Sequence, residues 1–179
     1  MTMPSSGPDL NALFAIFPGP VDLPAVEEVP AEALPEPYHR LLVHEHHMTV
    51  ALEAHHGKPV YVRVLERHRQ GSWYARKSLL FLVGTERVVQ FGIMRINLDL
   101  CSPQVRRTIL DESTPLGRIL IRHNVLRRIE PTAFLRVTPG PAMIKWFSLD
   151  SPRPTYGRIA LIHCDHKPAV ELLEIVTPE

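Results

Sequence analysis

Histidine side chains gather in one stretch of the chain, and neutral imidazole is a common ligand of zinc. The stretch contains His44, His46, His47, His55 and His56. The His-Glu-x-x-His pattern of zinc peptidases is absent, because Glu45 lies inside the run His44-x-His46-His47. We therefore interpret these residues as solvated surface histidines and predict that no bound metal is needed. A zinc site that includes His44, His47 and His55 is the alternative.

Two carboxylates on the last apolar segment are candidates for proton transfer. Residues 169–176 alternate in the manner of a strand, with Glu171 and Glu174 on opposite faces among apolar side chains. A carboxyl group in an apolar setting can carry a proton or hold a hydroxyl group. The periodicity alone does not choose between Glu171 and Glu174.

The hydrophobic periodicity indicates which elements position these residues. Helices are predicted over 41–56, from Ser102-Pro103 to Leu110, and over 116–123. Strands are predicted over 60–65, 74–83, 87–96, 134–137, 158–163 and 169–176. Short turns join most of the strands, and the last two read as a closing hairpin. The expected fold class is therefore α+β, with an antiparallel sheet of about six strands and helices on one side.

The prolines mark a boundary near the start of the chain. They recur from Pro18 to Pro37, and Pro20, Pro24, Pro30 and Pro35 lie between. Such spacing favours an extended segment. We predict that residues 1–37 form a proline-rich extension that wraps the core, and that residues 38–179 form the domain.

Composition limits the classes of function. The chain has 179 residues, 45% of them hydrophobic, and a formal net charge of +1, so no global field favours nucleic acid or an anionic membrane. Its two cysteines do not suggest a disulfide framework. We find neither a signal-peptide core nor an apolar run of membrane-spanning length, and we expect a cytoplasmic protein.

Four short stretches, in this order, resemble the chorismate lyase family. The first is 41–49, a helix with the pair Met48-Thr49, and the second is 74–80, a strand with Arg76 before a Leu-Leu pair. The third is 114–120, which is similar to the family's Thr-Pro-Leu-Gly-Arg stretch and is followed by Arg128. The fourth is Lys167-Pro168 with a hydrophobic strand that contains Glu174. The resemblance runs from about residue 41 to residue 178.

The resemblance implies an antiparallel sheet with helical flaps over an enclosed site. It implies a lyase that removes pyruvate from chorismate to give 4-hydroxybenzoate, or an isomer, without a cofactor, with ubiquinone biosynthesis as one candidate pathway. Carried over by position, Arg76 and Glu174 would be the catalytic residues. The substrate- and product-binding residues would be Met48, Leu116, Gly117 and Arg128. The chain departs from the pattern after Gly92, where many family lyases have arginine and this sequence has Ile93.

The chemistry of such a ligand explains these residue types. A guanidinium grips a planar carboxylate through two parallel hydrogen bonds, which is the expected role of Arg76. A helix that begins near Leu116 would add free backbone N–H groups. The same fold resembles the effector-binding domains of some bacterial transcription regulators. The alternative function is therefore a non-catalytic sensor of a small aromatic carboxylate.

Overall fold

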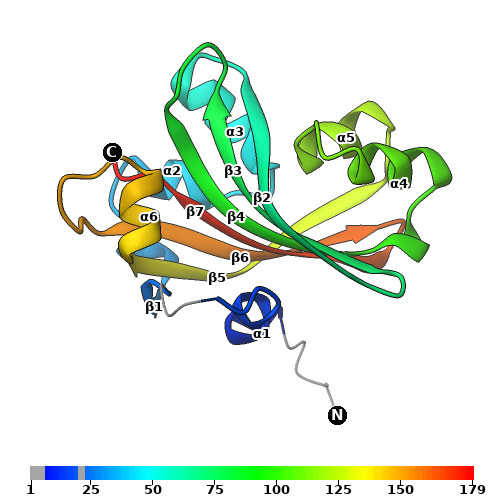
Figure 1. The fold of residues 1–179 in the computed structure, drawn as a ribbon, viewed down its shortest axis with the longest axis horizontal. Coiled ribbons are helices and arrows are strands. Elements are labelled where there is room, and N and C mark those ends of the chain that lie inside the picture. Colours follow the sequence, from blue (N-terminus) through cyan, green and yellow to red (C-terminus); the bar gives the residue numbers. More distant parts are fainter. Residues whose placement is uncertain (1–6, 20–22) are drawn as a thin grey trace.

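One antiparallel sheet organises the molecule. The computed structural model describes residues 7–19 and 23–179. Within them, seven strands follow the order β1-β5-β6-β7-β4-β3-β2 (Figure 1). The strands are β1 (Ala25–Val29), β2 (Val60–Gln70), β3 (Trp73–Leu82), β4 (Val88–Asn97), β5 (Arg127–Thr138), β6 (Thr155–Cys164) and β7 (Lys167–Val176). The helices are α1 (Leu10–Ala15), α2 (Tyr38–Leu42), α3 (Met48–His56), α4 (Pro103–Leu110), α5 (Leu116–Arg122) and α6 (Pro141–Trp146), with 3-10 turns at Ala31–Ala33 and Leu98–Leu100.

The closing hairpin has the predicted form. Strands β6 and β7 pair antiparallel, and the pair Cys164↔Lys167 leaves a two-residue loop. Asp165 and His166 in that loop have φ angles of 49° and 67°. Left-handed backbone at both positions is typical of the type I′ turn, whose twist matches that of the flanking strands. The α+β class is confirmed, and at a coarse level the architecture matches a chorismate lyase-like fold.

The single helix predicted over 41–56 is wrong in its middle. The structure has two helices there, α2 and α3, separated by an irregular connection of residues 43–47. The carbonyl oxygens of Leu42, His44 and His46 accept hydrogen bonds from Arg158, and they are therefore turned away from a continuing helix. The predicted end at residue 56 is confirmed, because α3 ends there and Gly57 follows it with a φ of 65°.

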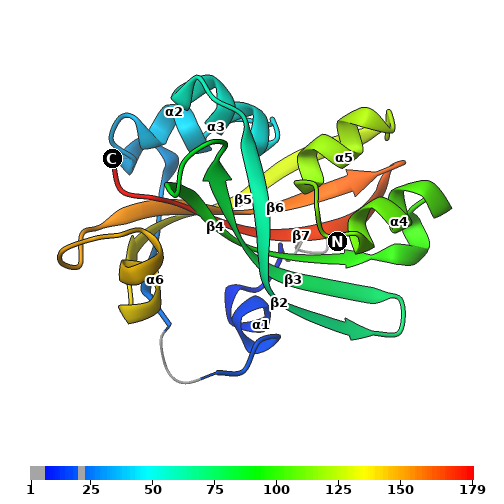
Figure 2. The ribbon, with the colours of Figure 1, turned by 45° about the horizontal axis from the view of Figure 1, so that its top comes forward.

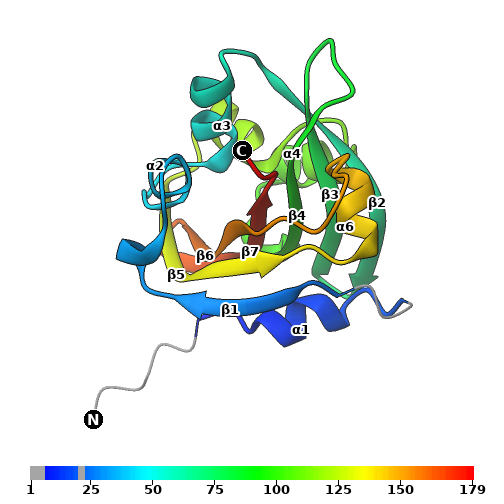
Figure 3. The same cartoon turned by 90° about the vertical axis from the view of Figure 1, so that its left-hand side faces the viewer.

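The sheet has one more strand than predicted because part of the proline-rich segment joins it. Strand β1 pairs antiparallel with β5, and Figure 3 shows it along one edge of the sheet. Pro24 and Pro30 flank this strand. Because the strand lies at the edge of the sheet, the N–H groups that these prolines lack are not needed for hydrogen bonds between central strands. Pro20 and residues 1–6 lie outside the described residues. The division of the chain at residue 37 stays a prediction.

Helices cover both faces of the sheet, so the prediction that they lie on one side is wrong. On one face, α2 and α3 lie over one end and α4 and α5 over the other (Figure 2). Each pair packs on its own apolar cluster, represented by Leu52 in the first and Ile119 in the second. On the opposite face, Leu13 of α1 and Met143 of α6 belong to one apolar cluster with Ile93. The boundary between the two helix pairs lies over the middle of β3, β4 and β7.

Candidate functional site

Strands β3, β4 and β7 present three aligned rows of side chains toward the helices. The middle row is Ser78, Gly92 and Glu174, which lie side by side. The flanking rows, two residues away along each strand, are Arg76, Met94 and Leu172 on one side and Leu80, Gln90 and Val176 on the other. Glycine therefore occupies the centre of the array, where any other residue would project a side chain toward the helices.

A cavity of about 60 Å³ lies over Gly92. A Cβ atom added to Gly92 would meet no atom closer than the Leu173 carbonyl oxygen at 3.4 Å and the Gln90 amide nitrogen at 3.5 Å. These are ordinary contacts, so the position could hold a side chain without backbone strain. The absence of one leaves the floor of the cavity open.

The first turns of α3 and α5 form the roof. Met48 and Thr49 of α3, and Leu116 and Gly117 of α5, line the cavity. The two helices meet so closely that a Cβ atom on Gly117 would lie 2.9 Å from His47 Cβ. Gly117 therefore has a packing role, because it allows α5 to approach the start of α3 and close the roof.

Arg76 is a buried cation with an incomplete set of partners. Its side chain lines the cavity and the residue is 3% exposed. Nη2 donates to the Thr114 carbonyl oxygen at 3.3 Å, whereas buried Nη1 has no hydrogen-bond partner among the described residues. Burial lowers the pKa of Arg76, although an arginine remains charged at neutral pH.

The nearby carboxylate of Glu112 is occupied elsewhere. One of its oxygens, Oε1, accepts a 2.6 Å hydrogen bond from the Tyr74 hydroxyl. The other, Oε2, lies 2.7 Å from Arg67 Nη2. Within the described part of the chain, Arg76 makes no ion pair, although Tyr74 and Glu112 partly oppose the lowering of its pKa, and its Nη1 remains available to a ligand in the cavity.

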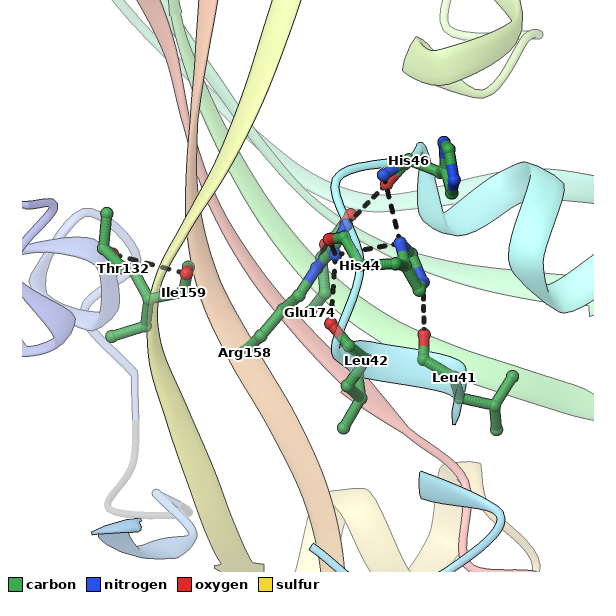
Figure 4. A network of polar contacts seen from close by, with 8 residues as sticks. All are labelled: Leu41, Leu42, His44, His46, Thr132, Arg158, Ile159 and Glu174. Atoms are coloured by element: carbon green, nitrogen blue, oxygen red, sulfur yellow. Dashed lines mark hydrogen bonds and ion pairs between the residues drawn. The ribbon is translucent and has the colours of Figure 1, made fainter. Parts of the chain in front are cut away.

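Glu174 has an ionic setting rather than the apolar one that the sequence predicted. Its Oε2 accepts a 2.8 Å hydrogen bond from Arg158 Nε, and Arg158 is fully buried. Figure 4 shows the two side chains pointing together toward the connection between α2 and α3. The reason for the difference is cross-strand pairing: Arg158 of β6 lies directly opposite Glu174 on the same face. Glu174 still lines the cavity, so its carboxylate forms part of the wall.

Arg128 does not join the other predicted residues. It is exposed, and its Nη2 lies 3.2 Å from Glu130 Oε2. Its neighbour Arg127 approaches the cavity instead, because Arg127 Nε donates to His47 Nε2 at 2.7 Å. Burial, together with the charges of Arg127 and Arg158, lowers the pKa of His47 to about 4. His47 is therefore neutral at neutral pH and accepts this hydrogen bond.

The structure separates the histidines that the zinc alternative grouped. His47 accepts from Arg127, and His44 Nε2 lies 2.6 Å from the Leu41 carbonyl oxygen. His55 and His56 lie at the other end of α3, where their Nε2 atoms are 3.3 Å and 3.7 Å from Glu179 Oε1. In the described ranges, only His55, His56 and Glu179 could together hold a metal ion. The absence of a required metal stays a prediction.

The sequence missed three residues of the site. Arg158 begins the strand that the sequence predicts over 158–163, a place where arginine is usually solvated, and Gln90 lies in a strand with nothing to distinguish it. His47 was assigned to a surface cluster. The usable signal was the register of the hairpin, which places Arg158 opposite Glu174.

Comparisons with known proteins identify the fold. No family model matches the sequence, and no curated protein matches it. The chain is similar to the solved effector domain of PhnF from Mycobacterium smegmatis, with 12% identity, a TM-score of 0.53, and coverage of 74% of this chain and 88% of that one. The likeness is one of fold. A solved structure of PhnF from the same organism gives 12% identity and a TM-score of 0.55 over 72% of this chain. The chain spans 62% of the length of that protein.

A further match is the ligand-binding domain of a regulator assigned to the GntR family, from Bordetella bronchiseptica. It shares 12% identity, with a TM-score of 0.48 over 64% of this chain and 83% of that domain.

These findings overturn the prediction of an enzyme. We expected a chorismate lyase, but the similar solved structures are PhnF and its effector domain, and neither is described as a lyase. In residues 7–19 and 23–179, no helix is long and apolar enough to cross a membrane.

Proposed function

We propose that this chain is a non-catalytic binding module for a small organic acid, held over Gly92. The observation that carries the proposal is the unpaired, buried Nη1 of Arg76 at the cavity. A buried charge without a partner is unfavourable, and an anionic ligand would offset that cost. A planar carboxylate suits a guanidinium because the two groups form parallel hydrogen bonds.

The start of α3 adds to the attraction for an anion. This helix has nine residues, and the side chain of its N-cap, His47, makes no capping hydrogen bond. Met48 and Thr49 of its first turn line the cavity beside the guanidinium. Free N–H groups at a helix start carry partial positive charge, which favours a carboxylate nearby.

The size of the cavity indicates that the roof moves when the ligand binds. An engineered cavity that binds benzene measures about 150 Å³, whereas this one measures about 60 Å³. An aromatic acid therefore requires α3 or α5 to shift outward. A sensor needs such a step, because only a ligand that binds two states unequally changes their populations.

Binding of 4-hydroxybenzoate by isothermal titration calorimetry tests the proposal. We expect the wild type to bind and the Arg76→Met variant to lose affinity roughly 30-fold to 1000-fold, about 2–4 kcal/mol. Arg69→Met, at an exposed position of the adjacent strand, is the matched control and should bind as the wild type does. Equal binding by Arg76→Met and wild type, or no binding of either benzoate or 4-hydroxybenzoate at millimolar concentration, would contradict the proposal.

A further inference from the structure

The cavity contains a second buried polar group without a partner. Gln90 is 7% exposed and lines the cavity. Its Oε1 is buried and accepts no hydrogen bond within the described residues. Of the three buried side-chain atoms in this condition, Arg76 Nη1 and Gln90 Oε1 both belong to residues of this one cavity.

The Gln90 amide lies over the floor of the cavity. Gln90 and Gly92 are two residues apart on β4 and therefore share a face. The amide nitrogen is 3.5 Å from the place where a Cβ atom of Gly92 would stand. A ligand seated over Gly92 therefore contacts the nitrogen of this amide, and the unpaired Oε1 belongs to the same group.

Arg76 and Gln90 belong to the two opposite outer rows of the array. Arg76 is opposite Met94, and Gln90 is opposite Leu80, so four residues separate the two positions along the strands. This corresponds to about 13 Å along the strand direction and about 5 Å across it between Cα atoms. Both side chains line the cavity, and a ligand between them meets a cation at one end and an amide at the other.

We propose that Gln90 is a specificity-determining residue of this cavity, which selects acids that carry a hydroxyl or amino group at the end away from the carboxylate. This inference rests on the proposed function and names the class of ligand. An amide carries one acceptor and one donor group, and a hydroxyl or amino group can donate as well as accept. Such a group satisfies Gln90, whereas a hydrogen or methyl group leaves its buried carbonyl unpaired.

A buried polar group that only some ligands can pair distinguishes between ligands more strongly than the shape of a cavity does. A ligand without the donor would enter the cavity and still leave Gln90 Oε1 without a hydrogen bond, so it would gain nothing from this amide.

Calorimetry with benzoate, 3-hydroxybenzoate and 4-hydroxybenzoate tests the inference on wild type and Gln90→Met. We expect the wild type to bind its preferred hydroxybenzoate about tenfold more tightly than benzoate. Gln90→Met should bind benzoate at least as tightly as the wild type does and should lose the preference. Gln104→Leu, at an exposed glutamine of α4, is the matched control and should keep it.

The outcomes separate this inference from the proposed function. A wild type that binds benzoate and both hydroxybenzoates equally, or a preference that survives in Gln90→Met, overturns the role of Gln90 and leaves the acid site intact. Binding of none of the three acids overturns the proposed function and this inference together.

Two further measurements guard against a variant that fails to fold. Ligand-free Gln90→Met should melt at or above the wild-type temperature, because methionine removes a buried unpaired carbonyl. A lower melting temperature would show that Gln90 already has a partner in the free protein, which contradicts the premise. Gln90→Glu keeps an acceptor of similar shape and should keep the preference for the hydroxyl group; loss of the preference would contradict the inference.

Discussion

Arg76 and Arg158 project from the same face of the sheet, and their surroundings differ sharply. Arg158 is fully buried, and it donates to the Glu174 carboxylate and to the carbonyl oxygens of Leu42, His44 and His46. Arg76 is 3% exposed and donates to one carbonyl oxygen at 3.3 Å.

Arg76 and Arg158 therefore have different roles, although their side chains are chemically identical. A buried guanidinium with its charge balanced and its N–H groups satisfied stabilises the surrounding structure. A buried guanidinium with an unpaired N–H group at a cavity destabilises the ligand-free protein, and a bound anion offsets that cost. Substitutions can test this contrast through the free energy of unfolding, from the largest expected effect to the smallest.

Replacement of Arg158 by methionine should produce the largest loss. The change leaves Glu174 buried without its partner, and we expect the free energy of unfolding to fall by about 3–5 kcal/mol in urea titrations. The double variant Arg158→Met with Glu174→Met should recover part of the loss, because no unpaired charge remains. A loss below about 1 kcal/mol in the single variant would remove the distinction between the two arginines.

Acidification should destabilise the protein through His47. Its folded pKa of about 4 lies below the unfolded value of about 6.5, so the unfolded chain binds more protons between these pH values. The contribution of neutral His47 to the free energy of unfolding is fully present above pH ~6.5. It should decrease by up to about 3 kcal/mol as the pH falls to ~4. Urea titrations at several pH values measure this slope.

His47→Gln should reduce that slope without abolishing it. Burial also lowers the pKa of His44 and of His56, and both shifts act in the same direction. Stability that stays constant or rises between pH 6.5 and pH 4 would contradict the burial of neutral His47 beside two guanidinium groups.

Replacement of Arg76 by methionine should have the opposite sign from the Arg158 variant. In the absence of ligand, the change removes a buried charge without a carboxylate partner, and we expect a gain of about 1–2 kcal/mol in the free energy of unfolding. Arg69→Met should stay within about 0.5 kcal/mol of the wild type. A clear loss of stability in Arg76→Met would show that Arg76 holds the fold as Arg158 does.

Of these substitutions, Gly92→Ala should have the smallest effect on stability, but it should clearly weaken ligand binding. The new methyl group meets ordinary contacts at 3.4–3.5 Å, and alanine restricts the unfolded chain, so the free energy of unfolding should stay within about 1 kcal/mol of the wild type. The same methyl group occupies the cavity floor, and affinity for 4-hydroxybenzoate should fall. Unchanged affinity, measured by calorimetry, would place the ligand away from Gly92.

The sequence predicts features that local pattern determines. Alternating apolar residues indicate the strands, and the four matching stretches indicate side chains that do line the cavity, such as Arg76, Met48 and Leu116. Their roles toward a ligand remain predictions. The sequence does not predict features that depend on which strands become neighbours. Arg158 is buried because β6 lies beside β7 and below the α2–α3 connection, and no local pattern records that neighbourhood.

The predicted helix over 41–56 fails for the same reason. Its hydrophobic periodicity suits a continuous helix, but a tertiary partner takes the carbonyl groups in its middle. The proline-flanked strand β1 was also missed, because prolines at both ends indicate a turn-rich segment unless the segment is known to lie at a sheet edge.

The bond between Glu174 and Arg158 joins the wall of the ligand cavity to the α2–α3 connection, so we expect the two to be thermodynamically linked. Glu174 lines the cavity on one side and holds Arg158 on the other, while Arg158 holds the carbonyl groups that precede α3. A ligand that binds Glu174 changes the free energy of that connection, and linkage is reciprocal. If the bound acid changes the dissociation constant of a second molecule at residues 43–47 by some factor, that second molecule changes the dissociation constant of the acid by the same factor.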